Sequence, residues 1–96
     1  MPSVYFSQRA LSNLERVFNF LAQEAPAIAT ETANEIVDAT GILQRHPLIG
    51  RPVGNLRELV ISKGRTGYVA LYRYLPGQDR VDILTIRHHR ESGLVE

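Results

Sequence analysis

The sequence contains no cysteine and no tryptophan, and a single methionine, among its 96 residues. The absence of cysteine excludes disulfide bonds and thiol chemistry, so a reducing cytoplasm is the expected compartment. No stretch approaches the roughly 18 consecutive apolar residues of a membrane-spanning helix, and the N-terminus lacks the basic and apolar regions of a secretion signal. We therefore expect one cytoplasmic domain, residues 1–96, without a membrane association.

The chain also lacks a large excess of one charge, because its formal net charge is +1. The two halves nevertheless differ in net charge. Two arginines against five acids give residues 1–44 a charge of −3, whereas nine basic residues against five acids give residues 45–96 a charge of +4. Lys63 is the only lysine, and arginine is better suited to bidentate binding of phosphate or carboxylate. The second half is expected either to face an anionic partner or to be a solvated, arginine-rich surface.

The first half is predicted to form a short strand and two helices. Residues 4–6 favour a strand, and Ser7 follows as a good N-cap for a helix over residues 8–24. A second helix is expected over residues 26–45, because Pro26 suits the first turn and His46-Pro47 ends the helix. The apolar stripe expected on the first helix is Leu11, Leu14, Val17, Phe18 and Leu21.

The second half reads as three strands, over residues 57–61, 68–75 and 81–87, separated by Gly-, Pro- and Asp-containing turns. Residues 48–54 are expected to be an ordered loop. Strict alternation would place Ile86 on the face of the last strand opposite to Ile83. The tyrosines of residues 68–74, at alternating spacing, are more often part of a core than of a base-stacking platform. The predicted fold is α+β: an N-terminal strand, a two-helix hairpin and a three-stranded antiparallel meander, with the helices packed on the sheet.

Several short segments, in this order, cover nearly the whole chain: residues 6–11 (FSQRAL), 43–47 (LQRHP), 50–52 (GRP), 56–61 (LRELVI), 68–73 (YVALYR) and 81–91 (VDILTIRHHRE). On these segments the chain resembles the RelE/ParE superfamily of toxins from type II toxin–antitoxin, or plasmid stabilisation, modules. The resemblance implies a growth-inhibiting toxin that a cognate antitoxin neutralises, in a hetero-oligomer. It also implies the α+β fold described above.

The superfamily has two main branches. RelE-like members cleave mRNA on the ribosome as metal-independent endoribonucleases with basic side chains, and ParE-like members inhibit DNA gyrase without known catalysis. The positions that carry the reactive cations in the first branch are Val60, Ser62 and Val69 here. A scissile phosphate needs fixed cations nearby, so the resemblance favours the ParE-like branch with gyrase as partner. The ribosome with mRNA is the alternative, and an inactive antitoxin-binding module is a third.

The side chains best suited to catalysis lie together in residues 87–91, at the end of the last predicted strand. If the chain is a nuclease, the predicted catalytic residues are His88, His89 and Arg90, since histidine is a natural general acid or base. Arg65, Tyr68 or Arg73 is expected to share that site. The alternative is a solvated strand end with its arginines paired to Glu58 or Asp82.

No metal site and no cofactor is expected, because neighbouring histidines on a strand point to opposite faces. The residues expected to contact the target or the antitoxin are Arg51, Arg57, Arg65, Tyr68, Arg73, Arg87, His88 and Arg90.

Overall fold

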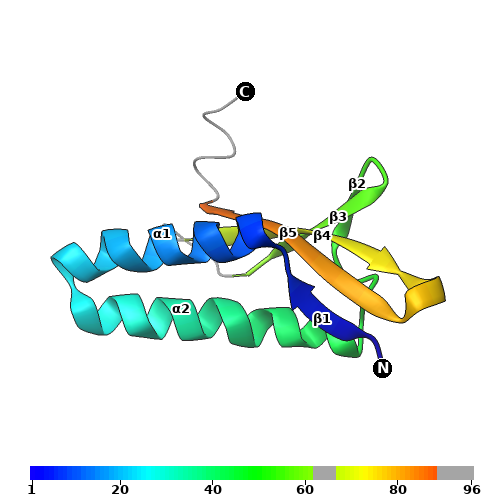
Figure 1. Ribbon diagram of the computed structural model, residues 1–96, viewed down its shortest axis with the longest axis horizontal. Helices are drawn as coiled ribbons and strands as arrows, with labels where there is room; N and C mark the ends of the chain where they lie inside the picture. Colours follow the sequence, from blue (N-terminus) through cyan, green and yellow to red (C-terminus); the bar gives the residue numbers. More distant parts are fainter. Residues whose placement is uncertain (62–66, 89–96) are drawn as a thin grey trace.

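The computed structural model describes residues 1–61 and 67–88. Strand β1 (Ser3–Phe6) leads into two helices, α1 (Gln8–Glu24) and α2 (Pro26–Thr40), and α2 continues into a 3₁₀ turn, η1 (Gly41–Gln44). Strands β2 (Arg51–Val53), β3 (Leu56–Val60) and β4 (Tyr68–Leu75) follow, and a second 3₁₀ turn, η2 (Pro76–Gln78), precedes β5 (Arg80–His88). The two helices form an antiparallel hairpin beside the sheet (Figure 1). The predicted α+β fold is therefore confirmed.

Within the described residues, the sheet has five strands in the order β1-β5-β4-β3-β2. Strands β2 to β5 pair antiparallel, and β1 pairs parallel to β5. Strand β2 lies in the segment for which the sequence predicted only a loop. It is three residues long and contains Pro52, so its pattern is weak, and it joins β3 through a tight turn at Gly54, whose φ of 63° suits glycine.

Strand β5 contains a β-bulge that changes the predicted alternation. Leu71 pairs with Thr85, but Tyr72 pairs with Ile83, so Leu84 is an extra residue on β5. Ile83 and Ile86 are consequently both fully buried in the core, and the prediction that they lie on opposite faces was wrong. Among the described residues, the main core cluster draws on both helices, η1, β4 and β5, and consists of Ala10, Ile36, Leu43, Tyr68, Ala70, Tyr72, Val81, Ile83 and Ile86.

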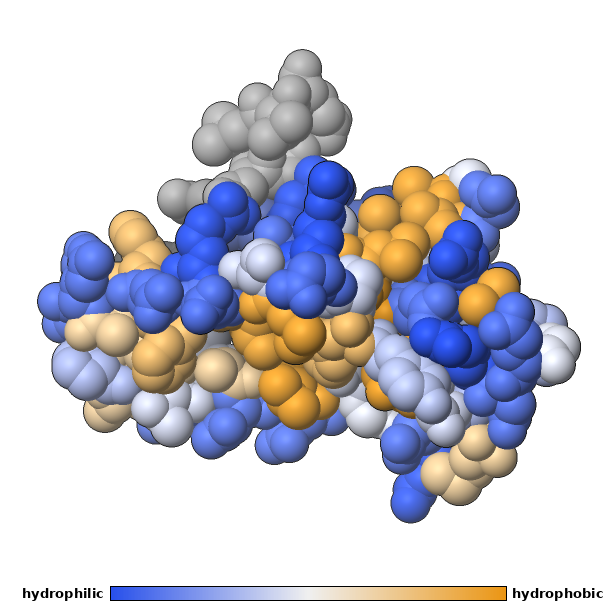
Figure 2. Space-filling view, viewed as in Figure 1, coloured by the Kyte–Doolittle hydropathy of each residue, from blue (hydrophilic) through white to orange (hydrophobic). Residues whose placement is uncertain are grey.

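Helix α1 has the predicted bounds but a narrower buried face than the predicted stripe. Ala10 is fully buried, and Leu14 and Val17 pack against the core, at the i, i+4, i+7 spacing of one helix face. Leu11 and Phe18 are 47% and 37% exposed, so these two members of the predicted apolar stripe lie at the surface. Apolar side chains therefore reach the surface over the helices, as Figure 2 shows. Among the described residues, neither helix is long and apolar enough to cross a membrane.

The second helix is shorter than predicted. It ends at Thr40, and the chain tightens into η1 at Gly41, which agrees with the low helix propensity of glycine. Ala29, Ile36, Thr40 and Leu43 are nevertheless buried, so one face of this segment packs inward although its backbone changes type.

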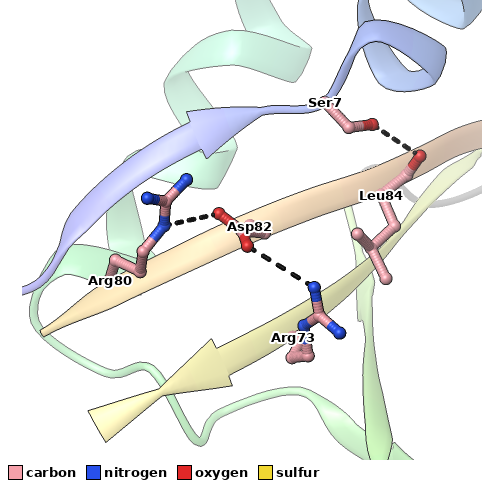
Figure 3. Close-up of polar contacts among 5 residues, drawn as sticks. All are labelled: Ser7, Arg73, Arg80, Asp82 and Leu84. Carbon is pink, nitrogen blue, oxygen red and sulfur yellow. Dashed lines mark hydrogen bonds and ion pairs between the residues drawn. The ribbon is translucent and has the colours of Figure 1, made fainter. Parts of the chain in front are cut away.

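Two polar side chains of the helical region complete the edge of β5 beyond the point where β1 ends. Ser7 Oγ accepts a hydrogen bond from the Ala10 amide, as the predicted N-cap, and donates to the Leu84 carbonyl at 3.0 Å (Figure 3). Asn13 Oδ1 accepts from the Ile86 amide at 3.0 Å. Helix α1 is thus fixed against β5 at the bulge residue Leu84 and at Ile86 beyond it, which positions one face of α1 beside the end of that strand.

Replacing Ser7 by alanine removes both the N-cap bond and the bond to the bulged strand. We expect Ser7→Ala to lower the free energy of unfolding by about 1–2 kcal/mol, measured by urea denaturation followed by circular dichroism. The matched control is Ser12→Ala on the exposed surface of the same helix, which should change stability by less than about 0.5 kcal/mol. Equal effects of the two substitutions would contradict this role of Ser7.

Candidate functional site

Three of the predicted site residues, Arg65, His89 and Arg90, lie outside the described residues. The other six fall in two regions of the sheet. Arg51, Arg57 and Arg73 lie on β2, β3 and β4, and their side chains make contacts within the chain. Tyr68, Arg87 and His88 lie where β4 begins and β5 ends.

Arg57 has a structural role beside the phenol of Tyr72. Its Nη1 donates to the carbonyls of Leu48 and Gly50, at 3.0 and 2.8 Å. The fully buried Tyr72 donates its hydroxyl proton to the Pro47 carbonyl at 2.7 Å and accepts from the Gly50 amide at 2.9 Å. These bonds hold the loop before β2 against the sheet.

The buried position of Tyr72 affects the pKa of its phenol and restricts position 50 to glycine. Burial raises the pKa of the Tyr72 phenol above 10.0, against the smaller opposing effects of the Gly50 amide and of Arg57. A Cβ on Gly50 would lie 2.7 Å from the Tyr72 hydroxyl and 2.9 Å from the Glu58 carbonyl oxygen. The phenol therefore occupies the space that any side chain at position 50 would need.

Carboxylates hold Arg51, Arg73 and Arg80. Arg51 Nη2 lies 2.7 Å from Glu58 Oε1, across the β2–β3 ladder. Asp82 lies between Arg80, at 2.9 Å, and Arg73, at 3.7 Å (Figure 3). Arg80 also stacks over the ring of Tyr5, with Cζ 4.3 Å from its centroid. The arginines of these ion pairs are exposed to solvent, whereas Glu58 and Asp82 are half-buried. The pairs reduce the positive charge of this part of the sheet.

The structure brings His88 and Tyr68 together but leaves Arg73 apart from them. The two rings meet edge to face, with centroids 5.2 Å apart. Arg73 is five residues along β4 from Tyr68, which is about 17 Å at the usual strand rise. Tyr68 is only 7% exposed, so the expectation that the tyrosines of this strand belong to the core is confirmed for Tyr68 and for Tyr72.

A groove between α1 and the end of β5 gathers three arginines. Arg9, Asn13 and Arg16 lie on one face of α1 at i, i+4 and i+7, and they face Thr85 and Arg87 across a hollow of about 290 Å³. No carboxylate of residues 1–61 and 67–88 lies within ion-pair distance of these arginines. Strongly hydrophilic side chains, dark blue in Figure 2, follow α1 accordingly.

The groove continues along α1 into a more apolar section of about 310 Å³. Its lining residues are Arg16, Val17, Phe20, Tyr68 and His88, so Arg16 belongs to both sections. Phe20 is 64% exposed. We call the two sections together the α1–β5 groove.

The sequence analysis selected Tyr68, Arg87 and His88 but missed Arg9, Arg16 and Phe20. Residues 1–44 carry a net charge of −3, which does not indicate a cationic site around their two arginines. Their separation by seven residues on a helix was the signal that could have found them, because it places both on one face. Chemically, the α1–β5 groove can bind anions at one end and planar apolar groups at the other.

Comparisons with known proteins agree with this architecture. A family model described as the ParE toxin of the type II toxin–antitoxin system parDE matches residues 4–93. Toxin RelE3 of Caulobacter vibrioides is 37% identical over 92 residues, which are 95% of this chain and 98% of the relative.

Two solved structures are also similar. A chain from the chromosomal ParDE toxin–antitoxin system of P. aeruginosa superposes with a TM-score of 0.78 at 25% identity, covering 92% of this chain and 96% of that one. A chain of the toxin–antitoxin complex RelBE2 of Mycobacterium tuberculosis gives a TM-score of 0.62, also at 25% identity, covering 92% and 91% of the two chains.

The Tyr72 hydroxyl is open to a direct stability test. We expect Tyr72→Phe to lower the free energy of unfolding by about 1–3 kcal/mol, because the buried Gly50 amide loses its acceptor. Tyr74→Phe, a half-buried neighbour on the same strand face, is the control and should change it little. Urea denaturation at neutral pH measures both, and an unchanged Tyr72→Phe variant would contradict the anchoring role.

The same pair of variants tests the titration. Because the pKa of Tyr72 is raised in the folded state, its contribution to stability is complete below pH 10.0 and is lost as the pH rises towards the folded pKa. The free energy of unfolding of the wild type should therefore fall more steeply above pH 10.0 than that of Tyr72→Phe. Tyr74→Phe should follow the wild type.

Proposed function

Because the chain belongs to the ParE toxin family of type II toxin–antitoxin systems, we propose that it arrests growth by binding DNA gyrase. The observation that carries this proposal is the apolar pair at positions where the nuclease branch has cations. Val60 and Val69 are direct neighbours in the β3–β4 ladder, and Val69 is 5% exposed. Such a pair offers a scissile phosphate no charge stabilisation. The third position, Ser62, lies outside the described residues.

The proposal includes a cognate antitoxin as a partner in a hetero-oligomer, in the cytoplasm. Two of the similar structures come from toxin–antitoxin systems. The chain also exposes large apolar side chains on the loop and strands beside β2, among them Leu48, Ile49, Val53 and Val60, each more than 40% exposed. Exposed apolar surface of this kind is typical of a protein that is covered by a partner.

Ribosome-dependent cleavage of mRNA is the second candidate function. It is favoured by the name of the relative RelE3 and by the position of His88 in a groove that also contains Arg16. A nuclease would use His88, with His89 and Arg90, as general acid–base and phosphate-binding groups. The third candidate function is that of a chain that binds an antitoxin but has lost its toxicity.

The gyrase proposal predicts that the purified chain inhibits supercoiling of relaxed plasmid by gyrase at micromolar concentration. It also predicts that the double variant His88→Ala, His89→Ala remains toxic on induction, because no catalytic step requires the histidines. Untouched supercoiling at a large excess of the chain would overturn the proposal.

Pulse labelling after induction of the chain alone distinguishes the candidates in cells. The gyrase proposal expects thymidine incorporation to fall within minutes while methionine incorporation continues. If methionine incorporation falls first and the double histidine variant abolishes the effect, the nuclease replaces the gyrase proposal. If neither falls, the chain is an inactive antitoxin-binding module.

A further inference from the structure

The α1–β5 groove presents a stripe of side chains along one face of α1. Arg9, Asn13, Arg16 and Phe20 occur at i, i+4, i+7 and i+11, so all four point in nearly the same direction. They line the groove, and no described carboxylate lies within ion-pair distance of the two arginines. The exposed Phe20 comes last along the helix. The stripe is therefore cationic first and apolar at its C-terminal end.

Helix α2 carries the opposite charge on its outward face and contains no lysine or arginine. Glu31, Glu35 and Asp38 occur at i, i+4 and i+7, are exposed, and line one open hollow of the surface. None of the three forms an ion pair with a described residue. Ile28 lies three residues before Glu31 and is 54% exposed. The stripe on α2 is therefore apolar first and then acidic.

The spacings of the two stripes agree. Two arginines seven residues apart lie on α1, and two acids seven residues apart lie on α2, which is about 10.5 Å along either helix. The apolar side chain follows the cations on α1 and precedes the acids on α2, so an antiparallel arrangement aligns like with like. It aligns four pairs: Arg9 with Asp38, Asn13 with Glu35, Arg16 with Glu31, and Phe20 with Ile28.

We propose that the α1–β5 groove binds α2 of a second copy of this chain, antiparallel to α1. The guanidinium groups of Arg9 and Arg16 then pair with carboxylates that have no described ion-pair partner in their own chain. Phe20 packs against an isoleucine that is otherwise exposed to water. Because the net charge is only +1, two copies repel each other little. The groove and the outward face of α2 are different surfaces, so the contact is heterologous.

The middle of the proposed contact is also complementary. Asn13 Oδ1 already accepts a hydrogen bond from the Ile86 amide, so the NH₂ group of Asn13 is the part that can donate to Glu35 of the second copy. Arg87 lines the same section from β5 and adds a third cation opposite the three acids. Charge therefore matches charge along the whole length of the two stripes.

The inference goes beyond gyrase inhibition and does not depend on it, because the test contains no gyrase. Sedimentation equilibrium of the full-length chain over a range of concentrations measures self-association directly. We expect the average mass to rise above that of the monomer with concentration, and to fall again at high salt, which screens charge pairs. Circular dichroism verifies that each variant is folded.

Charge reversal separates this contact from general stickiness. Arg16→Glu and Glu31→Arg, each alone, should weaken self-association by at least about tenfold, because like charges then face each other. Mixing the two variants should restore association, since one copy supplies an intact α2 and the other an intact groove. The double variant should restore it as well, with the charges exchanged. Glu15→Arg and Arg45→Glu are the matched controls at exposed positions outside both stripes, and neither should weaken it.

The apolar end of the contact has its own pair of variants. Phe20→Ala should weaken self-association by about fivefold, because the side chain no longer buries apolar surface against Ile28. Phe18→Ala changes another exposed phenylalanine of α1 that does not line the groove, and it should leave self-association unchanged.

Association that the exchange of charges restores supports the proposal. A chain that stays monomeric at every concentration overturns it. In that case, binding of a polyglutamate peptide that depends on Arg16 would assign the groove to an acidic segment of another protein. Association that all the variants retain would also overturn the proposal, because the copies would then meet through a different surface.

Discussion

The hydroxyl of Tyr72 is the contact on which the arrangement of the strands depends. It lies in the core, where an unpaired polar group would be costly, and it is satisfied by a carbonyl and an amide of the loop between η1 and β2. The loop must therefore approach the sheet closely, and only glycine at position 50 leaves room for it. Arg57 then binds two carbonyls of the same loop. One buried phenol thus connects the helical half of the chain to β2 and β3.

Seven of the described arginines divide into two groups with different surroundings. Arg51, Arg57, Arg73 and Arg80 are held by carboxylates or backbone carbonyls, and they shape the sheet and its first loop. The other group lies in the α1–β5 groove, where described carboxylates are absent within ion-pair distance. A chain with a net charge of +1 can in this way present a locally cationic surface. The placement of the acids matters more than the total charge.

The sequence predicted most of the helices and strands, but it did not predict how the strands pair with one another. Periodicity and the Ser7 cap predicted α1 with its observed bounds, and turn residues predicted β4. The bulge at Leu84 could not be predicted, because it depends on how β5 pairs with β4 and is not marked by any local pattern. Strand β2 exists because Arg51–Val53 can pair with β3, which is again a tertiary property.

The candidate site was predicted less completely than the fold. His88 and Tyr68 were selected correctly as neighbours, since both lie next to a predicted turn or strand end. Arg57 was expected at a binding surface, but nothing local indicates that carbonyls of a loop would bind its guanidinium group. Arg9 and Arg16 become part of the α1–β5 groove only because Ser7 and Asn13 hold α1 against β5. A site shared by two elements requires knowledge of how they pack.

The parallel pairing of β1 with β5 has a consequence for how the protein is made. Ser3 pairs with Arg80, and the core includes Ile86, so the first strand has no partner until almost the whole described chain has been synthesised. Contacts this distant in sequence form late in folding. While the chain is still being translated, the ribosome therefore carries an incomplete sheet and no α1–β5 groove. A chain with this topology completes its sheet only when synthesis is nearly finished.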